Sequence, residues 1–270
     1  NPEVREAIHD VMRFWMRRGA DGFRLDVLWH LIKDAGFRDN PPNPHFLPGM
    51  NQMLAVLQTR STDQPEMIDV IGGLRQVADE FPRCVLLGEI YLPVDRLVRY
   101  YGEEGRGVHL PLNFHLIETP WNAESIAELI RNYERALPPG AWPNWVLGNH
   151  DRPRIATRIG APQARAGAML LLTLRGTPTL YYGDELGMTD VEISPDRVQD
   201  PRELRQPGLG LNRDPVRTPM PWDDSAGAGF SPGNSWLPVG PDHNERNVAT
   251  MQRDPTSILN LYHALLALRR

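Results

Sequence analysis

The sequence predicts an α/β fold, a (β/α)₈ barrel of which this chain carries a part. Five short apolar runs alternate with amphipathic helical runs along most of the chain. Four of these runs end in acidic or histidine side chains, and in a barrel such residues would share the face where barrel enzymes do chemistry. No glycine-rich nucleotide-binding motif follows any of the runs, which disfavours an open doubly wound sheet.

The first half of the chain predicts one helix followed by strand–helix repeats. From Pro2 to Arg18, apolar residues recur at three- and four-residue intervals, and Gly19 then provides a stop. The stretch "RDNPPNPHFLPG" is expected to be a loop because Pro and Asn favour turns. The predicted strands cover residues 21–28, 84–92 and 107–117, and the predicted helices cover 67–81, 93–101 and 124–137.

The second half continues the alternation and then departs from it. Strands are predicted over 142–150 and 177–186, and helices over 151–159, 162–176 and 256–270. Residues 187–256 are rich in Pro, Gly, Asp and Arg and show little periodicity, so we expect one long ordered insertion between the last strand and the last helix. The chain starts at Asn1 without a Met, and we expect 1–270 to be the C-terminal part of a catalytic barrel.

Composition narrows the range of partners. The chain has a net charge of −5 and no basic cluster, which argues against nucleic acid. Its longest apolar stretch is too short to cross a bilayer, so no membrane partner is expected. Cys84 is the single cysteine, which excludes an internal disulfide and a thiolate metal cluster and suits a reducing, cytoplasmic location.

Three carboxylates at predicted strand ends point to a catalytic site. Each carboxylate has an ordinary structural explanation: Asp26 could form an ion pair, Glu89 could stabilise a turn, and Asp151 could cap a helix. Their joint placement at strand ends favours a catalytic role instead. Two facing carboxyl groups suit cleavage of a glycosidic bond. Arg24 lies two residues before Asp26 and is expected to keep it ionised as the nucleophile. Glu89 follows apolar residues without an adjacent cation, so burial should keep its proton available for acid/base catalysis.

Several motifs resemble the α-amylase family of glycoside hydrolases. "GFRLD", "GEIY" and "GNHD", in that order, are similar to the family's catalytic motifs. "TPTLYYGDELGM" and "DPVRTPMPWDDSAGAGFS" resemble stretches of its α-glucosidase and oligo-1,6-glucosidase branch. The resemblance makes Asp26 the nucleophile, Glu89 the acid/base and Asp151 a third carboxylate that binds sugar hydroxyls. By the same resemblance, Arg24, His150 and Arg217 bind substrate, and Arg217 would contact the far hydroxyl of a terminal glucose.

The resemblance implies a retaining, exo-acting α-glucosidase that acts on small oligosaccharides or disaccharides by double displacement. Its two catalytic carboxyl groups should lie about 5–5.5 Å apart. Val27, directly after the nucleophile, gives a slight preference for α-1,6 over α-1,4 links. One alternative is a transglycosidase or isomerase of the sucrose or trehalose type, because such enzymes share the three carboxylates. Another is a non-catalytic binding protein like the ectodomain of amino-acid transporter heavy chains, which lose those carboxylates.

The resemblance also predicts what this chain does not contain. The family's first three barrel strands, the domain after the third strand and the calcium-binding loop of some members have no counterpart in it. We therefore expect barrel strands 4 to 8, no cofactor and no metal site, and little or no activity from the chain alone. Asn212 and Pro221 stand where relatives often have Gly and Gln, which affects loop detail rather than the reaction.

Overall fold

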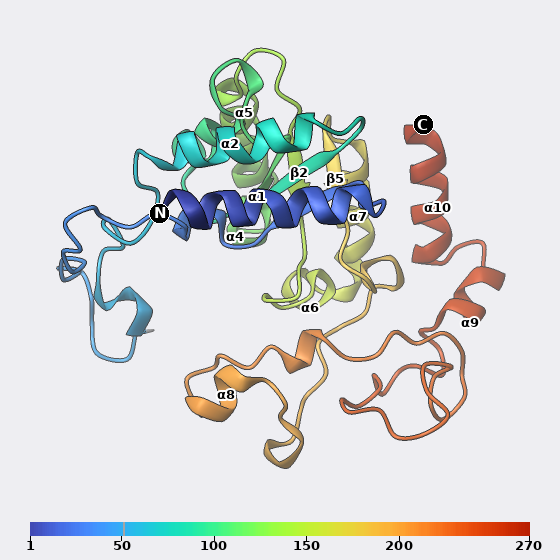
Figure 1. The fold of residues 1–270 in the computed structure, drawn as a ribbon. Coiled ribbons are helices and arrows are strands. Elements are labelled where there is room, and N and C mark those ends of the chain that lie inside the picture. The colour runs from blue at the N-terminus through green and yellow to red at the C-terminus, as the bar shows by residue number, and fades with distance from the viewer. Residues whose placement is uncertain (51) are drawn as a thin grey trace. The chain divides into compact units, whose positions relative to one another are not determined.

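A computed structural model describes residues 1–50 and 52–270, and the chain divides into two compact units (Figure 1). Unit 1 comprises Asn1–Phe114 and Ala123–Asn144. Unit 2 comprises His115–Asn122 and Trp145–Arg270.

Unit 1 is built on a three-stranded parallel sheet with the strand order β1-β2-β3. The strands are β1 (Gly22–Leu25), β2 (Val85–Ile90) and β3 (Leu110–Asn113). Each is shorter than the corresponding predicted strand but lies inside it. Because parallel strands need a crossover connection, helices and loops separate them along the chain, as the alternating pattern predicts.

Helices and turns surround this sheet. The α-helices of unit 1 are α1 (Pro2–Arg17), α2 (Met67–Asp79), α3 (Val94–Leu97) and α5 (Ala123–Ala136). Its 3₁₀ helices are Leu28–His30, Gln52–Ala55, Val98–Tyr101 and Glu103–Gly105. Helix α2 packs on both α1 and β2, and its apolar residues at helical spacing, among them Met67, Ile71 and Leu74, are buried there. The predicted helix 93–101 consists of one α-helical turn, α3, followed directly by the 3₁₀ helix Val98–Tyr101.

Helix α1 buries a different face from the one its apolar residues suggest. Met12 and Met16 are its buried residues. Four other apolar residues, which we call the α1 apolar face, remain about half exposed: Val4, Ile8, Val11 and Trp15. Since these four recur at helical spacing, they form one continuous stripe rather than scattered exposures.

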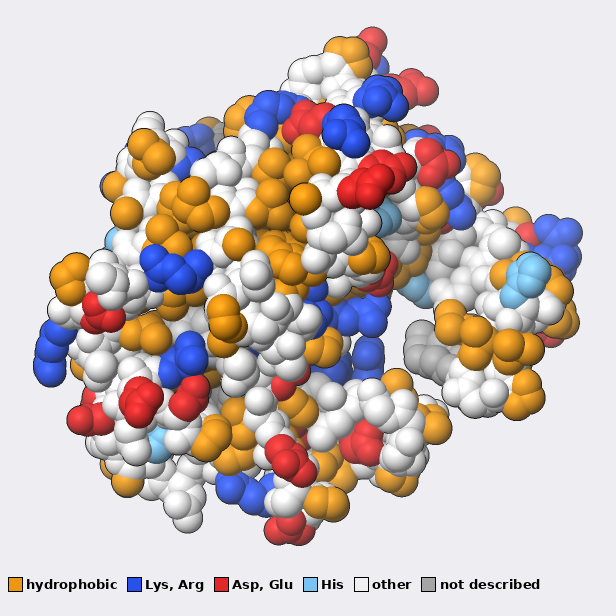
Figure 2. All heavy atoms as spheres, turned by 180° about the vertical axis from the view of Figure 1, so that it is seen from behind, with side chains coloured by type: hydrophobic (Ala, Val, Ile, Leu, Met, Phe, Trp, Pro, Cys, Tyr) orange, Lys and Arg blue, Asp and Glu red, His pale blue; other side chains and the backbone are white. Residues whose placement is uncertain are grey.

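The described residues of the range 31–61, which are 31–50 and 52–61, form a long excursion from the sheet that carries exposed apolar side chains. The excursion is the blue segment that extends to one side in Figure 1, and in Figure 2 the same segment shows hydrophobic atoms on its surface. Phe37 and Leu47 are the most exposed of these side chains. An isolated bridge between Pro42 and Val56 closes part of the loop.

Unit 2 contains a two-stranded sheet and a helical core. Its strands are β4 (Asn144–Val146), which begins at the last residue of unit 1, and β5 (Thr177–Thr179). Its α-helices are α4 (His115–Glu118), α6 (Ile155–Ile159), α7 (Ala164–Thr173), α8 (Pro201–Arg205), α9 (Val248–Arg253) and α10 (Ile258–Arg269). Its 3₁₀ helices are Ala161–Gln163, Asp184–Leu186, Pro195–Arg197 and Asp214–Val216.

Helices α6, α7 and α10 pack their apolar residues together. Ala168 and Leu172 of α7 meet Tyr262 and Leu265 of α10 in one buried cluster. The predicted strand 177–186 is wrong beyond Thr179, because the chain turns at Gly183, whose φ of +87° favours glycine, and continues as a 3₁₀ helix.

Residues 187–256 have no strand but are held by buried polar side chains. Asp200, Asp214, Thr218 and Asn247 are all buried within this segment. Two short helices, α8 and α9, begin at side-chain caps provided by Asp200 and Asn247. Among the helices that the structure describes, none combines the length and the apolar character needed to span a bilayer.

Candidate active site

The register of the parallel sheet in unit 1 places two predicted catalytic residues side by side. Leu25 of β1 pairs with Gly88 of β2, so the next residue of each strand segment, Asp26 and Glu89, lies at the same level. Asp26 directly follows β1, and Glu89 is the second-last residue of β2. In parallel α/β folds, ligands bind at this carboxyl-terminal end of the strands.

Arg24 joins the two carboxyl groups. Its Nη1 donates to Asp26 Oδ1, and its Nη2 lies 3.0 Å from Glu89 Oε2. The backbone N–H of Val27 also donates to Glu89 Oε2, at 2.9 Å. Val27 has a left-handed backbone with a φ of +38°, which turns the chain after β1 and directs this N–H at the glutamate.

The expectation that Glu89 has no adjacent cation is therefore wrong. Arg24 is remote from Glu89 in the sequence, but β1 and β2 are neighbours in the sheet. A sequence pattern shows neighbours along one strand, whereas the ion pair is made between two strands.

The two carboxyl groups differ strongly in solvent exposure. The side chain of Asp26 is 72% exposed, whereas that of Glu89 is 5% exposed. Burial raises the pKa of Glu89 above its ordinary value. The Val27 N–H and the Arg24 charge act against this rise, while the hydrogen bond and charge of Asp26 add to it, and the net pKa remains raised. A buried carboxyl group whose pKa is raised, beside an exposed carboxyl group paired with a cation, suits acid/base and nucleophilic roles respectively.

The third predicted carboxylate lies in unit 2, where two arginines bind it. Asp151 Oδ1 accepts from Arg213 Nη1 at 3.1 Å and from Arg217 Nη2 at 3.0 Å. His150 Nε2 lies 3.5 Å from Asp151 Oδ2, and the carbonyl of His150 accepts from Arg217 Nε at 2.9 Å. Half of the predicted residues thus form one cluster after β4.

These cations decide the protonation state of Asp151. Partial burial by itself would raise the pKa of this carboxyl, but His150, Arg213 and Arg217 together hold the pKa below its ordinary value. Asp151 is therefore ionised near neutral pH and can accept hydrogen bonds. It is not suited to donate a proton to a leaving group.

Two members of this cluster, Arg213 and Asp200, are not among the residues that the sequence pattern indicated. Arg213 binds Asp151 on one side and Asp200 on the other. The available signal was the pair of arginines four residues apart in "NRDPVR", of which only Arg217 was assigned a role. Asp200 is distant from Asp151 in the sequence, and nothing in the local pattern links them.

The aromatic residues near the strand ends of unit 1 pack on one another. The rings of Tyr91 and Phe114 are stacked with their centroids 4.3 Å apart, and Trp29 lies against Tyr91 with centroids 5.7 Å apart. Trp29 and Phe114 are buried. Ring-to-ring packing therefore accounts for the placement of these aromatics.

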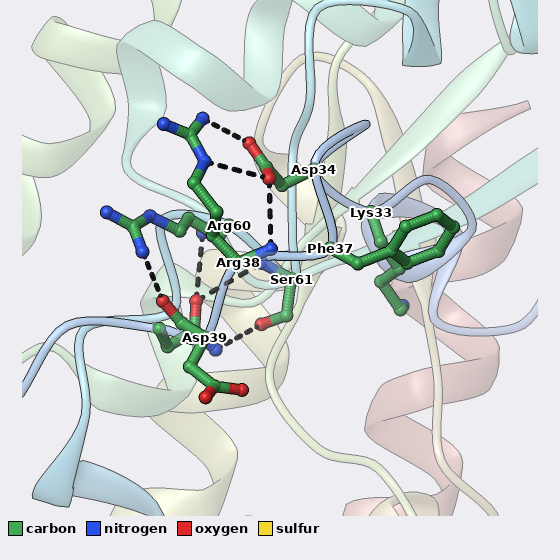
Figure 3. Close-up of a pocket in the computed structure, with 8 residues that line it drawn as sticks. Lys33, Asp34, Phe37, Arg38, Asp39, Arg60 and Ser61 are labelled. Atoms are coloured by element: carbon green, nitrogen blue, oxygen red, sulfur yellow. Dashed lines mark hydrogen bonds and ion pairs between the residues drawn. The ribbon is translucent and has the colours of Figure 1, made fainter.

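A separate hollow of about 240 Å³ lies in the 31–61 excursion of unit 1 (Figure 3). Two arginines that line it, Arg38 and Arg60, bind other parts of the same loop. Arg38 binds the carboxylate of Asp34, and Arg60 Nη1 donates to the carbonyl of Asp39 at 2.6 Å. Neither Asp26 nor Glu89 lines this hollow. In the described part of the chain, no group of three or more His, Cys, Asp or Glu side chains is arranged to hold a metal ion.

Comparison with known proteins places these motifs in a family. The profile of the α-amylase catalytic domain matches residues 1–270. An α-glucosidase of Apis mellifera is 36% identical over 281 residues, an alignment that covers all of this chain and 48% of the bee protein. The amino acid transporter heavy chain SLC3A1 of Homo sapiens is 34% identical over 278 residues, covering 98% of this chain and 39% of the human protein. The chain thus spans about half the length of such relatives, or less.

Solved structures match the fold as well. An α-glucosyl transfer enzyme, XgtA, superposes with a TM-score of 0.92 at 34% identity, over all of this chain and 52% of that protein. An isomaltulose synthase variant of Erwinia rhapontici NX5, in complex with its natural substrate sucrose, has a TM-score of 0.82 at 27% identity, over all of this chain and 53% of that protein. The predicted α/β class is confirmed, and the fold corresponds to about half the length of these barrel proteins.

Proposed function

The chain belongs to the α-amylase family, and from that premise we propose that it is part of a retaining α-glucosidase acting on terminal α-linked glucose. One observation carries the proposal: Arg24 links an exposed Asp26 to a buried Glu89 whose pKa is raised. Glycoside cleavage with retention needs one carboxyl that holds its proton and one that stays ionised, and the two groups here have those environments.

The proposed reaction has two displacements. Glu89 donates its proton to the oxygen of the leaving sugar while an Asp26 oxygen attacks C1, so the C1–O bond to the leaving group breaks as a glycosyl ester forms. The deprotonated Glu89 then removes a proton from water, the water oxygen attacks C1, and Asp26 leaves as a carboxylate. Glucose is released with the same anomeric configuration as in the substrate.

The remaining predicted residues have binding roles in this proposal. The ionised Asp151 accepts hydrogen bonds from sugar hydroxyls and strengthens them as positive charge develops at C1. As in the resemblance to the family, Arg24 and His150 bind the sugar that is cleaved, and Arg217 contacts the far hydroxyl of a terminal glucose, which restricts the enzyme to chain ends. A preference for α-1,6 links, an assignment of 1–270 to barrel strands 4 to 8, and a cytoplasmic location are further parts of the proposal.

Glucosyl transfer is the second candidate function. It is favoured by the similarity to a protein described as an α-glucosyl transfer enzyme, which is 34% identical over the whole chain. The first displacement would be the same, and a sugar hydroxyl would replace water in the second. A purely binding role, suggested by the similarity to a transporter heavy chain, would not require a buried acid beside an ionised carboxylate.

The test uses the complete gene product that contains this chain. We expect the native protein to release p-nitrophenol from p-nitrophenyl α-glucoside. In Asp26→Asn this turnover should fall by roughly 10⁴-fold or more. The control Asp79→Asn, which alters a surface ion pair with Arg75, should keep native turnover. NMR of the first product should show α-glucose. Glucose released in equal amount to p-nitrophenol indicates hydrolysis, and a deficit of glucose indicates transfer. No turnover of this substrate, maltose, isomaltose or sucrose would contradict the proposal.

A further inference from the structure

We propose that Asp200 is a positioning residue for this reaction, which holds the Arg213 guanidinium so that it reaches Asp151. The inference rests on the proposed function, in which Asp151 binds the sugar. It concerns contacts made entirely within unit 2.

The contact between Asp200 and Arg213 is bidentate and supported by the backbone. Arg213 Nε donates to Asp200 Oδ2 at 2.7 Å, and Nη2 donates to Oδ1 at 2.7 Å. The backbone N–H of Arg213 donates to the same Oδ2 at 2.9 Å. These bonds occupy one edge of the guanidinium and leave Nη1 directed at Asp151 Oδ1, 3.1 Å away. Bidentate pairing fixes the plane of a guanidinium, which a single hydrogen bond does not.

The carboxylate that holds Arg213 is itself fixed. The side chain of Asp200 is fully buried, and its Oδ1 caps α8 by accepting from the N–H of Arg202 at 3.1 Å. The backbone N–H groups of Gln199 and Asp200 both donate to Asp214 Oδ2, at 2.6 and 2.9 Å. The two parts of the insertion that carry Asp200 and Arg213 are therefore tied together at several points.

Arg213 has a specific effect on Asp151 because Arg217 binds the same oxygen. Two guanidinium groups meet at Asp151 Oδ1, while His150 lies near Oδ2. The two donors come from opposite sides of a short turn in the insertion, so they fix the rotation of the carboxylate. Loss of the Asp200 contact would leave the buried edge of Arg213 without its carboxylate partner, and the guanidinium would turn away from Asp151.

The test variant is Asp200→Asn. Asn has nearly the same shape as Asp and is an equally good helix N-cap, so the start of α8 is retained while the charged bidentate pair is lost. The matched control is Asp242→Asn, because Asp242 also pairs with an arginine of unit 2, Arg246, but touches neither Asp151 nor its arginines. Asp200→Glu is a second variant that restores the charge.

In the complete gene product we expect kcat/KM on p-nitrophenyl α-glucoside to fall roughly 10- to 100-fold in Asp200→Asn. Most of the loss should be in kcat, because the Asp151 contact strengthens at the transition state. Asp200→Glu should recover part of the loss, and Asp242→Asn should keep native kinetics. In an Arg213→Gln background, Asp200→Asn should have little further effect, because the residue it acts through is already gone.

A crystal structure of Asp200→Asn provides a readout that does not depend on activity. We expect Arg213 Nη1 to lie beyond hydrogen-bond distance of Asp151 Oδ1, and Arg217 to stay in place. An unchanged Arg213–Asp151 contact, or losses of kcat/KM that multiply in the double variant, would overturn the inference. If the native enzyme has no glucosidase activity, the function fails, while the crystal structure still decides whether Asp200 positions Arg213.

Discussion

Arg24 contacts two carboxyl groups that would need opposite protonation states in the proposed reaction. The arginine binds both Asp26 and Glu89, so its charge alone cannot separate their roles. Solvent exposure makes the difference, because Glu89 is buried and Asp26 is not. For Glu89, the desolvation of the charged form outweighs the attraction of the arginine.

Replacing the acid should affect substrates according to their leaving groups. In Glu89→Gln we expect kcat/KM for maltose to fall by about 10³-fold or more, because an amide cannot supply the proton. The fall for α-glucosyl fluoride should be much smaller, since fluoride leaves with little proton assistance. Steady-state kinetics on both substrates provide the measurement. Glu104→Gln, which alters a surface pair with Arg106, should change neither rate. Equal losses on both substrates would show that Glu89 is not the acid.

A second buried carboxyl, Asp184, should make stability depend on pH. Burial raises its pKa to about 7, against the opposing effect of the fully buried Arg154. The unfolded chain loses this proton near pH 4, whereas the folded chain keeps it up to about pH 7. The resulting stabilisation of the folded chain is complete below pH 4 and is lost as the pH rises through 7. The free energy of unfolding falls by up to about 4 kcal/mol over this range.

Asp184→Asn tests this residue directly. The amide stays neutral and can still accept the N–H of Tyr181 through its oxygen. Urea unfolding should give similar free energies for the native chain and the variant at pH 4, and a more stable variant at pH 8. If the difference between the two proteins is the same at both pH values, the proton on Asp184 is not the cause.

At the scale of elements, the contact between β1 and β2 controls the geometry of the proposed catalytic pair. The backbones approach so closely at Gly22 that an added Cβ would lie 2.0 Å from the carbonyl oxygen of Val85. Gly22 also has a backbone φ of +154°, an angle that residues other than glycine rarely adopt. A glycine is required here by the neighbouring strand.

Gly22→Ala should therefore displace β1 from β2. We expect a loss of about 2–4 kcal/mol in the free energy of unfolding and loss of turnover in the complete gene product, because Asp26 follows β1 directly. Gly72→Ala is the matched control. Gly72 lies inside α2 with open space around its Cα, so alanine should add about 0.5–1 kcal/mol of stability. Urea unfolding and turnover measure both effects, and native activity in Gly22→Ala would contradict the argument.

The boundaries of helices and strands differ in how closely they follow local sequence patterns. Helix α2 agrees with its prediction within two residues because its apolar spacing persists over several turns. Strand β5 has three residues instead of ten, because a buried apolar run has the same pattern whether it continues as a strand or turns. The strand ends at Thr179, and Gly183 then turns the chain into the 3₁₀ helix Asp184–Leu186.

At the scale of the whole molecule, the α1 apolar face is a stripe of apolar side chains that stays largely open to solvent. Val4, Ile8, Val11 and Trp15 are each about half exposed, and a contiguous apolar stripe of this kind promotes association. We expect the 270-residue chain, expressed alone, to bind the dye ANS and to associate as its concentration rises.

Replacing part of this stripe should reduce both effects. The double variant Val4→Glu and Ile8→Glu should lower ANS fluorescence and shift sedimentation velocity toward the monomer. Leu268→Glu is the control, because Leu268 is highly exposed but belongs to α10 and not to the α1 apolar face. Equal reductions of ANS binding and association in the two variants would contradict this prediction, because the effect would then not depend on the α1 apolar face.

The sequence by itself determined the α/β class, the order of helices and strands, and the identity of three candidate carboxylates. Those features follow from periodicity and from short motifs, which are properties of neighbouring residues. Only the tertiary structure decided that Arg24 also binds Glu89, that Arg213 and Asp200 support Asp151, and that α1 leaves its apolar stripe exposed. Ion pairs and burial depend on which distant segments become neighbours, because charge and desolvation act through space rather than along the chain.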